Sequence, residues 1–218
     1  MISDILRHTA ARWQNKCVST GSSMTYGEMY RRTQSGAAWI GRHPHHTDDG
    51  LQQHVVVICS NCPQVMEWHY SCAAAGAVVV NVNPHWTSKK VSEILRSLPS
   101  SSVVAVVYSD ALGHLVPSGY ETVCVDSGTR HEEIMGTTRT PATGVAVDPG
   151  TAFQLYFTSG TTGIPKSVYL SQNIVFQHAV GAADEMRFEE SDRWLADVPP
   201  GRYLRDLLGD TPWRLPRL

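Results

Sequence analysis

One short segment carries most of the chemistry visible in this sequence: residues 158–166, which read TSGTTGIPK. Its glycines allow a tight backbone turn that can bring several N–H groups close to an anion. The hydroxyl side chains add further hydrogen-bond donors, and the lysine adds a positive charge on a flexible stem. Because apolar runs flank the segment, we expect a polar pocket at a sheet edge that suits a polyphosphate. The candidate binding residues are Thr158, Ser159, Gly160, Thr161, Thr162, Gly163 and Lys166.

This segment differs from the Walker A loop, another phosphate-binding motif. A Walker A loop needs a glycine directly before the lysine and a helix after it. Here Ile164 and Pro165 intervene, and residues 167–170 have the composition of a strand. The alternative interpretation is an ordinary Gly/Thr hairpin turn, although such a turn needs neither the full pattern nor the lysine.

The rest of the chain alternates between short apolar runs and helical stretches, which predicts an α/β fold with a layered, mostly parallel sheet and flanking helices. The wholly apolar strands are typical of a sheet covered on both faces. In the first helix, Thr25 and Glu28 have capping-box spacing. Residues 127–150 are rich in Gly, Thr and Pro and are expected to form a linker. Expected strands cover residues 55–59, 77–82, 103–108, 122–125, 152–157 and 168–170, and expected helices cover 22–40, 63–75, 88–98 and 172–185.

Length and composition limit the class of protein. The 218 residues suit one domain, or one and a fraction, and the hydrophobic fraction of 42% is ordinary for a chain that buries a core. The net charge of −2 and the lack of a basic stripe argue against nucleic-acid binding. No apolar run approaches the ~20 residues of a membrane-spanning helix.

The cysteines indicate the compartment in which the protein works. Their number is odd, and the N-terminal stretch MISDILRHTA lacks the apolar core of a signal peptide. We therefore expect reduced thiols in an intracellular protein, with the cytoplasm as the expected compartment and an organelle left open. The five cysteines are Cys17, Cys59, Cys62, Cys72 and Cys124.

Two groups of side chains have the composition of a metal site. The first group has soft metal ligands at short spacing: Cys59, Cys62, His69 and Cys72. These residues could bind zinc, or they could equally be core side chains. The other could collect a surface metal, but a solvated loop is the favoured interpretation: His43, His45, His46, Asp48 and Asp49. We expect no metal site built by protein side chains. Scattered tryptophans indicate core or interface positions rather than a stacking platform: Trp13, Trp39, Trp68 and Trp86.

Longer stretches resemble a known family. LYFTSGTTGIPKSVYLSQ resembles the phosphate-binding motif of the adenylate-forming superfamily, which includes acyl-CoA synthetases, aryl-CoA ligases, luciferases and peptide-synthetase adenylation domains. Upstream, MTYGEMYRRTQSGAAWI is similar to an early helix of that family, and AGAVVVNVNP followed by WT is most similar to fatty acyl-CoA ligases. The resemblance covers residues 25–198 and implies the N-terminal part of the large, AMP-binding domain, expected over residues 1–198.

The resemblance implies a two-step reaction. A carboxylate attacks the α-phosphate of ATP to give an acyl-adenylate and pyrophosphate, and coenzyme A then displaces AMP to give a thioester. Mg²⁺ bridges the phosphates, and the developing charge needs preorganised donors and cations. By position in the motif, residues 158–163 would wrap the β- and γ-phosphates, with Lys166 beside them. The implied partners are small molecules: ATP, coenzyme A and a fatty or related carboxylic acid.

The sequence departs from the family pattern at two positions beside the loop. Ser167 stands where the family usually has glycine, and a serine would be strained if that position needs a positive φ. Gln172 stands where a histidine or a similar polar residue is common.

The resemblance ends at Pro200. Residues 199–218 form either an irregular C-terminal arm or, as we favour, a sequence that has lost its normal continuation by truncation or a change of reading frame. No segment matches the family's adenine-binding motif, its hinge or its lid domain with the adenylation lysine. We therefore expect an acid–CoA ligase by family that is weakly active or inactive in this form. The alternative is a truncated or pseudoenzyme form that binds nucleotide without catalysis.

Overall fold

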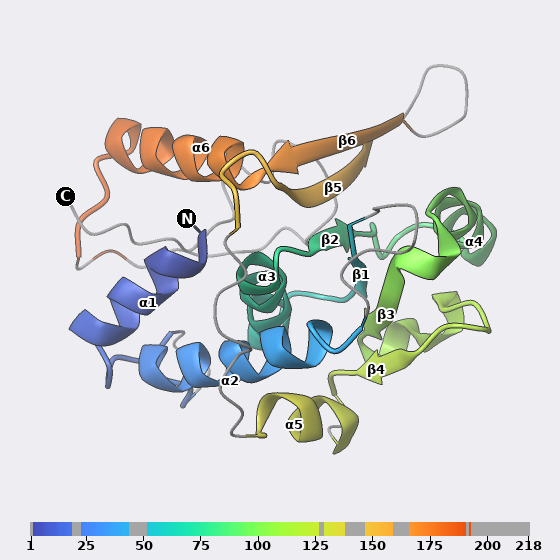
Figure 1. The fold of residues 1–218 in the computed structure, drawn as a ribbon, viewed down its shortest axis with the longest axis horizontal. Coiled ribbons are helices and arrows are strands. Elements are labelled where there is room, and N and C mark those ends of the chain that lie inside the picture. The colour runs from blue at the N-terminus through green and yellow to red at the C-terminus, as the bar shows by residue number, and fades with distance from the viewer. Residues whose placement is uncertain are drawn as a thin grey trace.

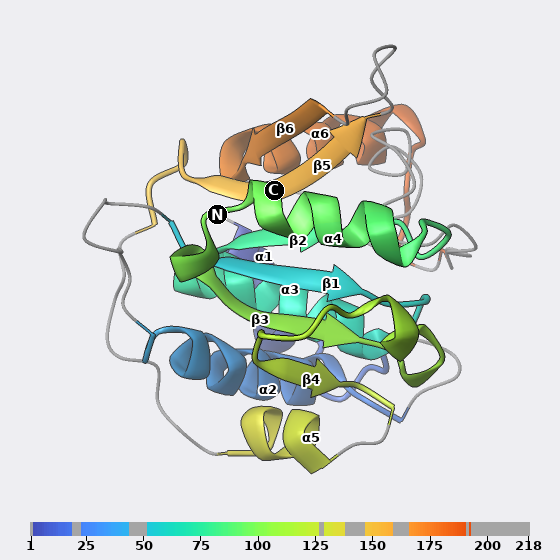
Figure 2. The same cartoon turned by 90° about the vertical axis from the view of Figure 1, so that its right-hand side faces the viewer.

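The described strands of the protein form one six-stranded sheet (Figures 1 and 2). The computed structural model describes residues 2–18, 23–43, 52–126, 129–137, 147–158, 166–190 and 192. All neighbouring strand pairs are parallel except β5–β6, which is antiparallel. The strand order is β4-β3-β1-β2-β5-β6, and the bounds are β1 His54–Ile58, β2 Val78–Asn81, β3 Val103–Tyr108, β4 Thr122–Cys124, β5 Ala152–Thr158 and β6 Lys166–Ser171.

Helices cover both faces of the sheet, which confirms the predicted α/β architecture. In Figure 2, α4 lies in front of the sheet, and α1, α2 and α3 lie behind it. Val175 of α6 joins the same apolar cluster as α3. None of the described helices is long and apolar enough to cross a bilayer. The helices are α1 Ile2–Arg12, α2 Tyr26–Ile40, α3 Pro63–Ala75, α4 Ser88–Ser97, α5 Thr129–Met135 and α6 Gln172–Glu185, with short 3-10 turns η1 Ser100–Ser102 and η2 Asp110–Leu115.

Strand β1 shows why the central strands carry apolar residues on both faces. All five of its residues are buried. Val55 and Val57 belong to the cluster beneath α3, whereas Val56 and Ile58 belong to the cluster beneath α4. A strand that is covered on both faces must be apolar on both, as the sequence predicted.

Most predicted elements are confirmed, with shifts at their ends. The helix predicted over 22–40 begins at Tyr26, because Thr25 keeps an extended backbone and its hydroxyl accepts from the Glu28 N–H at 3.2 Å. Helix α3 begins at Pro63, as predicted. It is followed by Gly76, whose φ of 70° is the left-handed conformation that commonly closes a helix.

Two helices were not predicted. The prediction of a linker over 127–150 was wrong in part, because the segment contains α5, whose His131, Ile134 and Met135 are buried. Helix α1 was also missed, although it buries Ile2 and Leu6. In both cases burial against the rest of the domain stabilises the helix.

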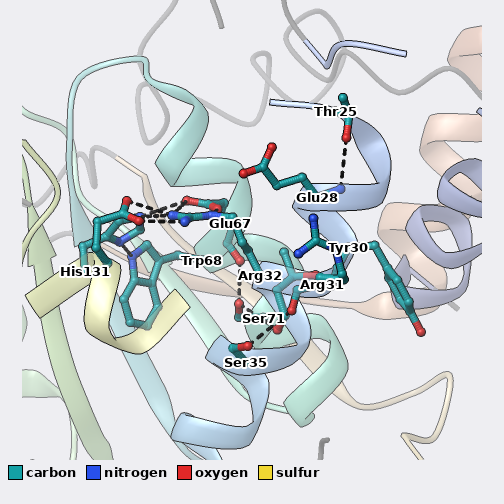
Figure 3. Close-up of polar contacts among 12 residues, drawn as sticks. Thr25, Glu28, Tyr30, Arg31, Arg32, Ser35, Glu67, Trp68, Ser71 and His131 are labelled. Carbon is teal, nitrogen blue, oxygen red and sulfur yellow. Dashed lines mark hydrogen bonds and ion pairs between the residues drawn. The ribbon is translucent and has the colours of Figure 1, made fainter. Parts of the chain in front are cut away.

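A buried carboxylate, Glu67 of α3, joins three helices (Figure 3). The Arg32 guanidinium of α2 pairs with it and also with Glu132 of α5, through Nη1 and Oε2 at 2.7 Å. His131 of α5 places its Nε2 2.9 Å from Glu67 Oε2. Burial alone lowers the pKa of Arg32, but the hydrogen bonds to Glu132 and Glu67 raise the pKa above its usual value. The guanidinium therefore stays charged inside the network.

The hydrogen bonds of His131 fix its tautomer. The Trp68 indole N–H donates to His131 Nδ1 at 3.3 Å, so Nδ1 carries a lone pair. The proton then sits on Nε2 and is donated to Glu67. The ring is therefore neutral, and Arg32 alone balances the charge of Glu67 within the described part of the chain.

Replacing Arg32 by alanine should destabilise the fold strongly. Glu67 is fully buried, and its carboxylate would be left without a cation. Removing one partner of a buried pair costs about 3–5 kcal/mol. Urea unfolding at neutral pH measures this loss as a decrease in the free energy of unfolding.

Arg130→Ala is the matched control for this variant. Arg130 pairs with Glu121 at 3.0 Å and with Glu133 at 3.4 Å, and all three side chains are exposed. Exposed pairs contribute about 0–1 kcal/mol. Equal losses in the two variants would show that the buried network does not hold the helices together.

Candidate functional site

The two ends of the predicted phosphate loop face each other at the end of a hairpin. Thr158 is the last residue of β5, Lys166 is the first residue of β6, and the two are paired in the antiparallel ladder. The structure thereby fixes where the loop begins and ends, and phosphate binding by its residues stays a prediction. The other residues predicted to bind phosphate lie outside the described part of the chain: Ser159, Gly160, Thr161, Thr162 and Gly163.

A strand, not a helix, follows Lys166, as the sequence predicted. This arrangement excludes a Walker A loop, in which a helix begins at the lysine. Strain at Ser167 was expected only if this position needed a positive φ, and it does not have one. Arg187 is the only described non-glycine residue with a positive φ, so serine fits the backbone at position 167.

The paired residues Thr158 and Lys166 lie at the carboxyl edge of the sheet. Strands β1, β2, β3 and β5 run parallel, so their carboxyl ends meet at one edge (Figure 2). The chain after β2 passes through α4 and back across β1 to β3, whereas the chain after β5 turns the other way into β6. Where neighbouring connections leave in opposite directions, α/β proteins form a ligand-binding crevice. The β2–β5 boundary is therefore the candidate site.

A residue that the sequence analysis did not single out for function lies at this boundary. Trp86, in the connection after β2, packs against Phe157, the residue before Thr158, with ring centroids 6.3 Å apart. The sequence analysis assigned Trp86 only to a core or an interface. The signal that could have located it was the Asn-Pro turn and capping threonine within residues 83–87, which fix the tryptophan at the end of a strand.

Gln172, by contrast, holds the scaffold together. Its side chain is fully buried, and its Nε2 donates to the Ala73 carbonyl oxygen at 2.9 Å. Its Oε1 accepts from the Ile2 N–H at 3.4 Å. One side chain thus joins the start of α6 to α3 and α1, which explains a polar residue at this position.

The side chains proposed as a zinc site make other contacts. Cys59 Sγ donates to the Val107 carbonyl oxygen at 3.7 Å, and His69 Nε2 lies 2.9 Å from Asn81 Oδ1. Burial raises the pKa of the Cys59 and Cys72 thiols, which disfavours the thiolate that zinc requires. Within the described ranges, no group of three or more His, Cys, Asp or Glu side chains is placed to hold a metal ion. All five cysteines carry free thiols.

The group of His and Asp residues that the sequence analysis interpreted as a solvated loop falls largely outside the described residues. His43 is described, and its ring packs edge-on against Trp39 with centroids 4.9 Å apart. The remaining members lie outside the description: His45, His46, Asp48 and Asp49.

The sequence pattern that defines AMP-binding enzymes matches residues 6–201. The chain belongs to this family. It is 27% identical over 181 residues to the 2-succinylbenzoate–CoA ligase of Oceanobacillus iheyensis, a match that covers 82% of the chain and 35% of the relative. It is 23% identical over 196 residues to a 4-coumarate–CoA ligase of Humulus lupulus, with 83% and 35% covered. The chain therefore spans about a third of the length of these relatives.

Solved structures show the same fold. The N-terminal domain of FACL13 from Mycobacterium tuberculosis superposes with a TM-score of 0.75 at 22% identity, over 91% of this chain and 51% of that one. The o-succinylbenzoate CoA synthetase of Bacillus subtilis, solved with its acyl-adenylate intermediate, gives 0.69 at 17% identity, over 90% and 49%. These matches confirm the expected fold class, a mostly parallel sheet with flanking helices.

Acidification should weaken the fold through His69. Burial lowers the pKa of His69 from 6.5 to about 4, against the opposing effect of its hydrogen bond to Asn81. Between these values the unfolded chain binds more protons than the folded one, so stability falls as the pH falls from 6.5 toward 4. The slope due to one such group reaches about 1.4 kcal/mol per pH unit. Urea unfolding at a series of pH values measures it.

His69→Gln should reduce this dependence, because glutamine does not titrate. His54, whose pKa burial also lowers to about 4, should supply the slope that remains. His114→Gln, which replaces an exposed histidine, is the matched control and should keep the slope of the parent chain. A His69→Gln variant with the parent slope would contradict the assignment.

Proposed function

We propose that this chain forms the triphosphate-binding part of an ATP-dependent acid–CoA ligase that acts on a fatty or related carboxylic acid. The observation that carries the proposal is the position of the segment 158–166. Its ends are paired as a hairpin at the carboxyl edge of the sheet, beside the β2–β5 boundary. Nucleotides bind at this edge in α/β enzymes, and the segment has the donors and the charge that a polyphosphate needs. The family match over residues 6–201 supports the same reaction class.

In the proposed reaction, a carboxylate oxygen of the acid attacks the α-phosphorus of ATP. The bond from this phosphorus to the β-phosphate oxygen breaks, and pyrophosphate leaves. The sulfur of coenzyme A then attacks the acyl carbonyl, the acyl–phosphate bond breaks, and AMP leaves as the thiol proton is released. Residues 158–163 and Lys166 would act in the first step by holding the β- and γ-phosphates while charge develops on the leaving group.

Mg²⁺ would enter this reaction on the triphosphate. No group of three potential ligands is found among the described residues, and Mg²⁺ is commonly held by one or two carboxylates together with substrate phosphates. The exposed side chain of Lys166 fits beside such a complex, because its ammonium group would balance phosphate charge that the ion leaves uncompensated.

The acid is proposed as a class, because the named relatives differ in the acid that they ligate. Coenzyme A is the proposed acceptor, and all partners in the reaction are small molecules. The free thiols at all five cysteines support the proposal that the protein works inside the cell.

Binding of ATP to this chain should be weak. About four to six charge-assisted hydrogen bonds at ~1.5–3 kcal/mol each give roughly 6–18 kcal/mol in total. Association costs an estimated ~4–15 kcal/mol. The midpoints of these ranges differ by only a few kcal/mol, which corresponds to dissociation constants of about a millimolar or weaker, so titrations must extend to that range.

Millimolar MgATP or pyrophosphate should protect the chain between residues 158 and 166 from proteolysis. Lys166→Ala should abolish this protection, because the positive charge of the loop is lost. Limited proteolysis followed by mass spectrometry of the fragments measures the cleavage rate at each site.

Lys16→Ala is the matched control for charge. Lys16 lies between α1 and α2, where its Nζ donates to the Glu190 carbonyl oxygen at 3.3 Å. This variant should keep the protection of the parent chain. Identical digestion of the parent chain with and without nucleotide would refute the proposed site.

Exchange of labelled pyrophosphate into ATP separates the ligase reaction from nucleotide binding alone. We expect little incorporation by this chain, because the loop holds the triphosphate only weakly. Incorporation above the Lys166→Ala level, dependent on a fatty or aromatic acid, would show that the chain forms the acyl-adenylate. Nucleotide protection without incorporation would identify a binding function alone.

A further inference from the structure

Two aromatic rings join the connection after β2 to the end of β5. The ring planes of Trp86 and Phe157 meet at 71°, with centroids 6.3 Å apart, which is an edge-to-face contact. Both side chains are half-buried and pack against the apolar cluster beneath α4. The contact lies at the root of the loop, by which we mean the last two ladder pairs of the hairpin: Phe157 with Ser167 and Thr158 with Lys166.

The local sequence holds Trp86 in this place. The backbone N–H of Trp86 donates to the Asn83 carbonyl oxygen at 3.1 Å, and Asn83 Oδ1 accepts from the backbone N–H of His85 at 2.9 Å. Asparagine at the first position and Pro84 at the second are typical of such a turn. The next residue, Thr87, caps α4, so the tryptophan sits between two fixed elements.

Lys90 restrains the indole further. Its Nζ lies 4.9 Å from the centroid of the Trp86 ring, within the range of a cation–π contact. The Lys90 backbone N–H donates to Thr87 Oγ1 at 3.3 Å, so the lysine belongs to the capped first turn of α4. The ring is therefore attached to the helix as well as to Phe157.

The end of β5 needs such an attachment because it extends beyond its inner neighbour. The described ladder between β2 and β5 consists of Val79 with Gln154 and Val80 with Leu155. Residues 156–158 lie past these pairs, and within the described ladders they pair with β6 alone. Among the described contacts at this end, the Trp86 ring joins Phe157 to the β2–α4 connection.

We propose that Trp86 is a positioning residue that holds the root of the loop against the β2–α4 connection. It acts through Phe157, and through the ladder on Lys166, and it sets where the lysine stands at the β2–β5 boundary. The nature of the ligand rests on the proposed function, whereas the mechanical role of Trp86 does not.

Amide hydrogen exchange of the ligand-free chain tests this role. In Trp86→Ala, exchange at the root of the loop should be about tenfold faster than in the parent chain, because the aromatic contact is lost. Exchange in β1 should be unchanged. Trp86→Phe should restore slow exchange at the root, because an aromatic ring is kept.

Two further variants keep the test specific. Trp13→Ala removes another half-buried tryptophan, which lies 4.6 Å from Arg12 Cζ and 5.6 Å from Lys16 Nζ, and it should leave the root unaffected. In a Phe157→Leu background, Trp86→Ala should add little, because the partner ring is already gone. Unchanged exchange in Trp86→Ala, faster exchange throughout the chain, or no rescue by Trp86→Phe would overturn the proposal.

Protection by MgATP then separates this inference from the proposed function. If Trp86 positions Lys166, Trp86→Ala should need a higher MgATP concentration for the same protection from proteolysis, while Trp13→Ala should match the parent chain. Equal concentrations for Trp86→Ala and the parent would contradict the positioning role while leaving the proposed function intact. A parent chain that MgATP does not protect would refute the proposed function, and the exchange rates would still decide the role of Trp86.

Discussion

The pairing of β2 with β5 is the contact on which the candidate site depends. To make it, the chain leaves β4 at one border of the sheet and returns on the far side of β2. The ladder is short, with two described pairs, but Phe153 and Leu155 of β5 are fully buried on opposite faces and reinforce it. Because the two strands are parallel, their carboxyl ends meet at the same edge. Without this pairing the hairpin would still hold the two ends of the loop, but the end of β2 would not lie beside them.

The helical layer behind the sheet is fixed by directional bonds as well as by apolar packing. Glu67 receives the Arg32 guanidinium and the neutral His131 ring, so each of its oxygens has a partner. These bonds join α2 and α5 to α3, the helix that begins just after β1 at the carboxyl edge. A buried carboxylate is tolerated only with such partners, and their geometry leaves little freedom for sliding of the helices. The layer therefore gives the sheet edge a rigid support.

Much of the fold follows from the sequence, for reasons that individual elements show. In β1, four apolar residues follow His54, and β3 is a run of β-branched and other apolar residues. Helix α3 starts at its proline. Helix α5 was not predicted because it is short and rich in charge. It is stabilised by the contact of His131 with Glu67, a residue that is remote in the sequence. The loop could be found from residue types alone, since glycines, hydroxyls and a lysine cluster in one segment. The contact of Trp86 with Phe157 could not be found in this way, because the sequence does not show which rings meet in the fold.

The antiparallel return of β6 has a consequence for the thermodynamics of ligand capture. Antiparallel strands can be joined directly, so Thr158 and Lys166 are brought together by the hairpin itself. Closing a flexible segment has an entropy cost that rises with its length, and here the ladder meets that cost during folding. An anion that bound between Thr158 and Lys166 would find these two residues already adjacent, so less of its binding free energy would be lost to chain entropy. The two ends of the segment 158–166 are therefore already paired in the folded chain before any ligand binds.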